Sequence, residues 1–260
     1  MKKLIEIIEN EDVTDLLGVT QYEAPDPAIM GGNAAGTLQN VGLLVSDEER
    51  IENLYGKYEK LKEFTYIKTE KLEGTSFTCY LKNNKFGVCG RTVDFKTPEE
   101  GIGYDQMNVY WKVALKFNLK KKMQELAYWH NYKDFAWQGE LVGEKIQKNI
   151  YKLKGQQVAM YTGFDITLQE YFDCGVFFAM MDEINVMTVP IIDRNFILPD
   201  DPKDLLLEAD KALTVFGNDL THLAEGHVYV AKGPFSINTR LVRANFNRLS
   251  FKAKSREYKL

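Results

Sequence analysis

The sequence predicts an α+β fold in which antiparallel sheets are flanked by helices. Two observations support this prediction. First, short runs bounded by Gly or Asn alternate apolar and polar residues, which is the period of half-buried strands. Second, these runs occur both before and after segments with the 3.6-residue apolar repeat of helices. The elements do not follow the strand–helix alternation of a doubly wound parallel sheet, and no internal repeat is visible. With 260 residues, 45% of them hydrophobic, the chain can bury a large core.

The composition is typical of a globular protein that is neither secreted nor embedded in a membrane. No apolar run reaches the roughly 18–20 residues that span a bilayer. Acidic residues interrupt the apolar start MKKLIEIIENED, so this start is not a signal peptide. The three cysteines, Cys79, Cys89 and Cys174, form an odd set without metal-ligand spacing. We therefore expect a reduced, intracellular, cytoplasmic protein without a structural zinc site.

The net charge of −4 hides a basic stripe at the end of the chain. From Phe235 onward, Glu257 is the one acidic side chain. A local stripe of positive charge attracts phosphates even on an acidic protein. A solvated tail is the equally weighted alternative. The basic residues of the stripe are Arg240, Arg243, Arg248, Lys252, Lys254, Arg256 and Lys259.

The first 40 residues are expected to be a linker-like segment that precedes one domain over residues 41–260. Within this segment, EAPDPAIMGGNAAG holds two prolines and three glycines, which favour irregular structure. The domain is expected to begin with a helix over residues 46–63, in which Ser46 is the N-cap and acidic residues fill the first turn.

A β-rich region follows the expected first helix. Residues 64–74, 75–84 and 85–95 alternate apolar and polar side chains, which predicts antiparallel strands with turns at Gly74 and at Asn83-Asn84. The remaining expected elements are a helix over 104–132, strands over 134–143 and 156–166, helices over 168–184 and 202–217, and strands over 225–232 and 248–255.

The hexapeptide Lys71-Leu72-Glu73-Gly74-Thr75-Ser76 is the first chemical motif of the chain. A lysine followed two residues later by a carboxylate and then by glycine is weak evidence alone, because a surface turn is the more common origin of such a pattern. Its context changes that interpretation. The lysine ends a predicted strand, Arg91 ends the next hairpin, and the segments WQGELVG, EGHV and FKAK then follow in order.

This ordered set resembles the covalent nucleotidyltransferase superfamily of DNA ligases, RNA ligases and mRNA capping enzymes. The signature of that superfamily is K-x-D/E/H-G, an Arg-containing segment, G-E, F-D, E-G and K-x-K, and all of these motifs occur here between Lys71 and Lys254. The segments TEKLEGTSFTCYL, FGVCGR and QGELVGEKIQKNIYKL are most similar to the RNA ligases related to the Deinococcus enzyme. The resemblance implies the adenylyltransferase fold of ligases, ATP and Mg²⁺ (or Mn²⁺) as cofactors, and RNA ends in a nicked duplex as partners of a monomer.

In the Deinococcus-like group, an N-terminal OB domain precedes the nucleotidyltransferase domain. Here residues 10–26 resemble the junction that follows the OB domain, so the resemblance implies a nucleotidyltransferase domain without its OB domain. A chain of this kind is expected to adenylate itself well and to seal RNA less well, because the OB domain helps to grip RNA.

The resemblance gives Lys71 the role of the nucleophile that accepts AMP. This amine must be neutral to attack the α-phosphate, so its pKa must fall from about 10.4. Lys252 and Lys254 are expected to lower that pKa and to stabilise the charge that grows on the phosphate, one contacting it directly and the other from a different angle. Glu225 is the expected carboxylate near Mg²⁺, through water.

The resemblance also implies residues that hold the nucleotide. Arg91 and Glu140 are expected to bind the ribose hydroxyls or nearby groups. Phe164, in the segment GFDI, is expected to stack on adenine, with Tyr161 as the alternative in a shifted register. A core aromatic is the alternative interpretation of Phe164.

Five more residues belong to the expected nucleotide site. Ser76 matches a polar contact near the phosphates in related RNA ligases. Arg50 matches an upstream arginine that serves sealing rather than adenylation, although a surface charge on a helix explains it equally well. Glu70, Leu72 and Glu73 flank the nucleophile, and Glu73 alternatively serves the turn.

These residues together predict an ATP-dependent RNA ligase. A DNA ligase or an mRNA capping guanylyltransferase is the alternative enzyme, and an inactive protein that binds nucleic-acid ends is the alternative from another class. The segment QGELVGEKIQ favours the RNA ligase, and the intact lysine and glutamates argue against an inactive site. The chain has no G-x-S-x-G elbow and no P-loop, so neither serine-triad chemistry nor a glycine-rich phosphate cradle is expected.

Overall fold

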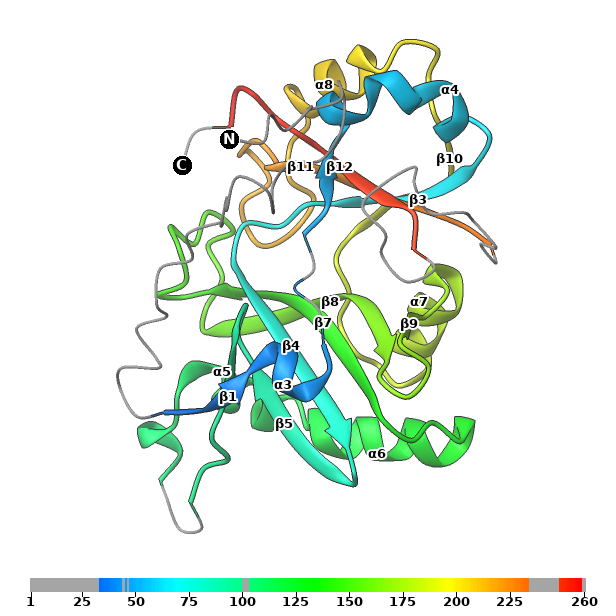
Figure 1. Ribbon diagram of the computed structural model, residues 1–260. Helices are drawn as coiled ribbons and strands as arrows, with labels where there is room; N and C mark the ends of the chain where they lie inside the picture. The colour runs from blue at the N-terminus through cyan, green and yellow to red at the C-terminus, as the bar shows by residue number, and fades with distance from the viewer. Residues whose placement is uncertain (1–32, 44, 46, 100–102, 234–247, 259–260) are drawn as a thin grey trace, which may run out of the picture.

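Two sheets, one above the other in Figure 1, form the framework of the protein. The computed structural model describes residues 33–43, 45, 47–99, 103–233 and 248–258. A seven-stranded antiparallel sheet has the order β1-β6-β5-β4-β7-β8-β9, and a five-stranded sheet has the order β10-β3-β11-β12-β2. The last pair, β12 with β2, is parallel. This arrangement confirms the predicted α+β class with antiparallel sheets and flanking helices.

The bounds of the elements are as follows. The seven-stranded sheet contains β1 (Ala34–Thr37), β4 (Thr75–Lys82), β5 (Lys85–Cys89), β6 (Val93–Phe95), β7 (Phe135–Gly143), β8 (Gln156–Asp165) and β9 (Glu170–Tyr171). The five-stranded sheet contains β2 (Glu49–Arg50), β3 (Thr65–Glu70), β10 (Ile191–Ile197), β11 (Gly226–Ala231) and β12 (Ser250–Lys254). The helices are α3 (Leu38–Val41), η1 (Ile51–Lys57), α4 (Tyr58–Leu61), η2 (Tyr104–Gln106), α5 (Val109–Lys116), α6 (Leu119–His130), α7 (Cys174–Glu183) and α8 (Lys203–Ala209).

Local sequence signals explain the elements that were predicted well. Asn83 and Asn84 have φ of 50° and 60°, and two successive positive φ values are what a two-residue turn between antiparallel strands requires. The side chain of Asn108 caps α5 by accepting a hydrogen bond from the backbone N–H of Trp111 at 3.0 Å. Asn118 adopts a left-handed conformation, with φ of 53°, and divides the predicted long helix into α5 and α6.

The start of the domain differs from the prediction. Residues 34–37 were expected to belong to the linker, and instead they form β1, which pairs with β6. Glu49 and Arg50 were expected to be helical, and instead they form β2 beside β12. The helix expected over residues 46–63 begins only at Ile51, because pairing with β12 satisfies the backbone of the two preceding residues. The expected N-cap, Ser46, lies outside the described residues.

The segment Lys71–Gly74 is not the hairpin turn that was predicted. β3 and β4 belong to different sheets, so this segment carries the chain from the five-stranded sheet to the seven-stranded sheet. A Cβ atom on Gly74 would lie 2.4 Å from the carbonyl oxygen of Leu141, so a side chain larger than hydrogen has no room there. The predicted nucleophile therefore stands where the chain crosses between the two sheets.

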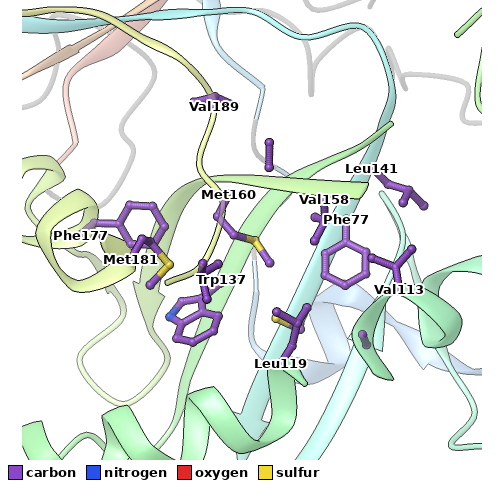
Figure 2. Close-up of a cluster of buried hydrophobic side chains, with 14 of the residues drawn as sticks. Phe77, Val113, Leu119, Trp137, Leu141, Val158, Met160, Phe177, Met181 and Val189 are labelled. Atoms are coloured by element: carbon purple, nitrogen blue, oxygen red, sulfur yellow. The ribbon is translucent and has the colours of Figure 1, made fainter. Parts of the chain in front are cut away.

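The largest hydrophobic core lies between one face of the seven-stranded sheet and helices α5, α6 and α7. Figure 2 shows Trp137 of β7, Met160 of β8 and Phe177 of α7 in this core. A second core joins the five-stranded sheet to α4 and α8, with Tyr66 and Leu205 among its buried residues. The first core also contains Ile67 of β3 and Val230 of β11, so it packs the two sheets against each other.

Candidate active site

A cavity of about 570 Å³ opens between the two sheets. Its lining comes from β3 and β12 of one sheet, from β4 and β7 of the other, and from the crossing segment. The structure therefore brings together residues that are up to about 200 positions apart in the chain, as the ordered motifs implied. The predicted site residues in the lining are Arg50, Glu70, Lys71, Leu72, Glu73, Ser76, Arg91, Glu140, Glu225, Lys252 and Lys254.

Glu225 joins two of the predicted lysines. Its Oε2 lies 2.7 Å from Nζ of Lys71, and its Oε1 lies 3.0 Å from Nζ of Lys254. The backbone fixes this arrangement, because the N–H of Lys71 donates to the carbonyl oxygen of Gly226 at 2.9 Å. Gly226 in turn pairs with Lys254 across β11 and β12. The carboxylate of Glu225 thus contacts two amines at once, with each of its oxygens at hydrogen-bond distance from one of them.

Lys252 and Lys254 project from the same face of β12, and both line the cavity. Residues two apart on a strand point in the same direction. Both amines therefore reach the cavity from the same face of β12. They differ in their partners, because Nζ of Lys252 lies 2.8 Å from Oδ1 of Asp47.

Asp47 also lines the cavity, although no sequence motif marks it. Its second oxygen lies 3.7 Å from the guanidinium of Arg91. Burial acts to raise the pKa of Asp47, but the hydrogen bond and the charge of Lys252 outweigh burial and hold this pKa below its usual value. An anionic group therefore already lies between two cations that were expected to hold a nucleotide.

A second carboxylate from the same segment reaches the end of β12. Oε1 of Glu48 lies 2.7 Å from Nη2 of Arg248, and Oε2 of Glu48 accepts a hydrogen bond from the hydroxyl of Ser250. The guanidinium of Arg248 also lies 5.1 Å from the ring centroid of Tyr171. Glu48 and Arg248 both line the cavity. Arg248 was predicted only as a member of the basic stripe, and no sequence motif marks Glu48.

The basic stripe at the end of the chain is largely paired where it is described. A carboxylate partner neutralises each of its described members, which leaves less uncompensated positive charge than the sequence suggested. The pairs are Arg248 with Glu48, Lys252 with Asp47, Lys254 with Glu225, and Arg256 with Asp210. Arg240, Arg243 and Lys259 lie outside the described residues.

Glu140 sits opposite Ser76 where β4 and β7 pair, and both line the cavity. Burial raises the pKa of the Glu140 carboxyl to about 7, although the nearby charge of Lys71 acts to lower it. The N–H of Gly74 also donates to this carboxylate. Glu140 is thus a carboxyl group that can change its protonation near neutral pH.

Replacing Glu140 with Gln is expected to change how stability depends on pH. In the unfolded chain the carboxyl ionises near 4.5, whereas in the folded protein it keeps its proton up to about 7. Between these values the folded state binds more protons, so Glu140 makes the folded protein less stable as pH rises. The melting temperature of Glu140→Gln relative to wild type should therefore be higher at about pH 8 than at about pH 5. An equal difference in melting temperature between Glu140→Gln and wild type at both pH values would contradict a raised pKa of Glu140.

Phe164 lies outside the cavity lining, which corrects its predicted position. Its side chain is 1% exposed and belongs to a core with Leu38 and Val41. Its ring centroid lies 5.0 Å from that of Tyr171 in an edge-to-face contact. The alternative interpretation as a core aromatic describes this residue, because α3 covers the sheet at this point.

Tyr161 is the aromatic residue of β8 that lines the cavity. Gln138 and Gly139, which are adjacent on β7, pair with Thr162 and Met160, so Tyr161 is the extra residue of a β-bulge. A bulge redirects the side chain of the additional residue. The bulge therefore accompanies the placement of Tyr161, and not Phe164, in the cavity lining.

The residues that flank Lys71 have distinct surroundings. The buried carboxylate of Glu70 accepts hydrogen bonds from the hydroxyl of Thr214 and from the N–H of Val215, the second at 2.9 Å. Burial raises the pKa of Glu70. Leu72 is 3% exposed and belongs to the main core, so it anchors the crossing segment between the sheets.

The lining residues favour a metal ion that is bound chiefly through its substrate. Among residues 33–99, 103–233 and 248–258, apart from the few positions not described, no group of three or more His, Cys, Asp and Glu side chains is placed to hold a metal. Mg²⁺ in nucleotide sites takes one or two carboxylates and completes its shell with phosphates and water. Glu225 and Glu140 fit that limited role. None of the described helices has the length and hydrophobicity needed to cross a bilayer.

A family model described as RNA ligase matches residues 64–254. This match covers most of the chain and contains the motifs from Lys71 to Lys254. The chain therefore belongs to the RNA ligase family.

Solved structures of the RNA ligase of Naegleria gruberi have the same fold. A variant without ligand and a variant with ATP and Mn each superpose with a TM-score of 0.73, and the enzyme with PPi superposes with a TM-score of 0.72. Each is 28% identical to this chain, over 94% of this chain and 65% of its own length. The chain thus spans somewhat less than two thirds of those ligase chains. A comparison with curated protein sequences finds no match.

Proposed function

We propose that this protein is an ATP-dependent RNA ligase that forms a covalent bond between Lys71 and AMP. One observation carries the proposal. Lys71 lies in a cavity between two sheets, in contact with Glu225 and surrounded by Lys252, Lys254 and Arg91. A cavity with several fixed cations suits a nucleoside triphosphate, and one amine among them is placed to act as a nucleophile. The Naegleria ligase, with the same fold, has been solved with ATP and Mn.

The first step transfers AMP to the protein. Nζ of Lys71 attacks the α-phosphorus, the nitrogen–phosphorus bond forms, and the bond to the bridging oxygen breaks, so pyrophosphate leaves with the electron pair. Glu225, 2.7 Å from Nζ, is placed to accept the proton of the amine. Lys254, released from Glu225, and Lys252 stabilise the charge on the phosphate oxygens. A divalent metal ion, when bound, adds positive charge at the pyrophosphate leaving group.

The two later steps act on RNA. An oxygen of the 5′-phosphate attacks the phosphorus of Lys71-AMP, so the nitrogen–phosphorus bond breaks and AMP moves to the RNA end. The 3′-hydroxyl oxygen then attacks the 5′-phosphorus, and AMP leaves as the phosphodiester bond forms. Arg50, exposed on β2 at the cavity rim, is proposed to serve sealing rather than adenylation.

The finer features of this proposal rest on the sequence resemblance. We propose the Deinococcus-like subtype, because residues 10–26 and the segment QGELVGEKIQKNIYKL resemble that group. Residues 10–26 lie outside the described residues. In this proposal the catalytic domain begins at β1, which belongs to the seven-stranded sheet, so the linker expected over residues 1–40 ends before Ala34. The enzyme is proposed to act as an intracellular monomer on nicked duplexes.

The proposal is tested by incubating the protein with magnesium and α-labelled ATP or GTP. Acid-stable, amine-sensitive label from ATP is the expected result. Label from GTP alone would instead favour a capping guanylyltransferase, and no label from either nucleotide would favour an inactive end-binding protein. Sealing of nicked duplexes with RNA or with DNA on the 3′-OH side distinguishes an RNA ligase from a DNA ligase.

Replacing Tyr161 with Ala is expected to weaken ATP binding. Stacking of a base on an aromatic ring contributes about 1–3 kcal/mol, so the ATP concentration that half-saturates labelling should rise about tenfold, with little change in melting temperature. Phe164→Ala is the matched control. Removing this buried ring should cost about 3–5 kcal/mol of stability and leave the ATP dependence of the folded fraction unchanged. The reverse pattern would assign adenine stacking to Phe164.

A further inference from the structure

The chain that follows β12 forms a compact turn beside the crossing segment. The N–H of Ser255 donates to the carbonyl oxygen of Glu225 at 3.0 Å. The hydroxyl of Ser255 accepts hydrogen bonds from the N–H groups of Glu257 at 3.2 Å and of Tyr258 at 3.1 Å. This turn is therefore hydrogen-bonded directly to the backbone of Glu225, the residue whose carboxylate contacts Lys71.

An ion pair fixes the turn on the side of α8. The backbone N–H of Arg256 donates to Oδ1 of Asp210 at 2.7 Å, and Nε of Arg256 donates to Oδ2 at 2.9 Å. A second guanidinium nitrogen also donates to Oδ2. Hydrogen bonds from both the backbone and a guanidinium to one carboxylate define the orientation of the turn more strictly than a single surface ion pair does.

Tyr258 extends from this turn to the residue that lies two positions after the nucleophile. Its hydroxyl donates to Oε2 of Glu73, which is 7% exposed. On the backbone side, the hydroxyl of Tyr151 accepts from the N–H of Glu73 at 2.6 Å. The other oxygen, Oε1 of Glu73, is buried and has no hydrogen-bond partner among the residues that the structure describes. Two tyrosines thus hold Glu73, and Tyr258 donates the hydrogen bond that one of its two buried carboxylate oxygens accepts.

We propose that Tyr258 is a positioning residue for Lys71, acting through Glu73. A buried carboxylate that loses its hydrogen bond must move toward water or remain unsatisfied, and either outcome displaces the segment that holds it. Lys71 stands two residues earlier in that segment, and its amine must approach the α-phosphorus in line with the leaving group. Displacements of about 1 Å are enough to slow such a step about a hundredfold. The inference rests on the proposed function, because it concerns the same adenylation step.

The test compares Tyr258→Phe with Tyr128→Phe, which removes the same atom from a side chain that is 85% exposed on α6. The rate of Lys71 labelling is measured in a single turnover over a range of ATP concentrations. Hydrogen bonds to charged groups contribute enough that Tyr258→Phe should slow labelling at saturating ATP about tenfold or more. The half-saturating ATP concentration should stay unchanged when labelling is measured well below the melting temperature of each variant, and Tyr128→Phe should match wild type. Labelling of Tyr258→Phe at the wild-type rate would overturn the inference.

The same substitution in a Glu73→Gln background tests whether Tyr258 acts through Glu73. If the two residues form one unit, Tyr258→Phe causes no further loss there. An equal further loss would overturn the inference.

Hydrogen exchange gives a readout that does not depend on activity. The amides of residues 71–76 should exchange faster in Tyr258→Phe than in Tyr128→Phe. If wild type accepts no label from any nucleotide, the proposed function fails, and this comparison alone then decides whether Tyr258 orders the segment. Equal exchange in the two variants would show that it does not.

Discussion

Lys71→Ala is expected to reduce covalent labelling by ATP to background. The lysine amine is the nucleophile in the proposed first step, so no other group in the cavity can replace it without moving. Lys71→Arg should fail equally, because a guanidinium keeps its proton in proteins and cannot attack the phosphorus. This pair separates loss of the nucleophile from loss of positive charge. Label is measured on the denatured protein after incubation with magnesium and α-labelled ATP.

Lys120→Ala is the matched control for Lys71. Lys120 is exposed on α6 and does not line the cavity. This control should label like wild type and melt at the same temperature as Lys71→Ala. Wild-type labelling of Lys71→Ala would refute Lys71 as the nucleophile.

Lys254→Met is expected to slow labelling about a hundredfold or more, the usual cost of removing one group that stabilises charge in a transition state. Two effects combine at this position. The cation that stabilises the phosphate is lost, and Glu225 is left with Lys71 as its remaining amine partner at hydrogen-bond distance in the cavity. Both effects disfavour a neutral, attacking Lys71. Single-turnover labelling at saturating ATP measures the rate.

Lys211→Met, at an exposed position after α8, is the control for loss of a lysine charge without contact to the cavity. It should label at the wild-type rate. Lys254→Arg should recover part of the activity, since it restores the charge with a different shape. Equal rates for Lys254→Met and wild type would show that the contact with Glu225 has no part in adenylation.

Much of the cavity was predictable because its motifs lie on regular strands. Lys71 follows one strand, and the segments EGHV and FKAK lie in two others. Antiparallel pairing of these two strands brings Gly226 opposite Lys254, and this places Glu225 between the amines of Lys71 and Lys254. Glu140, on the seven-stranded sheet, lines the same cavity as these three residues. Here the periodicity of the strands was enough to bring the motif residues together.

The side chains that were misplaced depend on contacts between distant segments. Whether Tyr161 or Phe164 faces the cavity is decided by a bulge that arises in the pairing of β7 with β8, and no local pattern marks it. Arg50 follows a helical repeat in the sequence, yet it becomes a strand residue because β12, about 200 positions later, pairs with it. Asp47, three residues earlier, reaches Lys252 through the same pairing.

The position of the AMP adduct tests the central claim most directly. Wild-type protein is incubated with ATP and magnesium, digested with a protease, and its peptides are sequenced by mass spectrometry. The proposed mechanism predicts AMP bound through nitrogen to Lys71 and to no other residue. An adduct on Lys252 or Lys254 in place of Lys71, or no adduct from ATP under conditions in which the protein is folded, would contradict it.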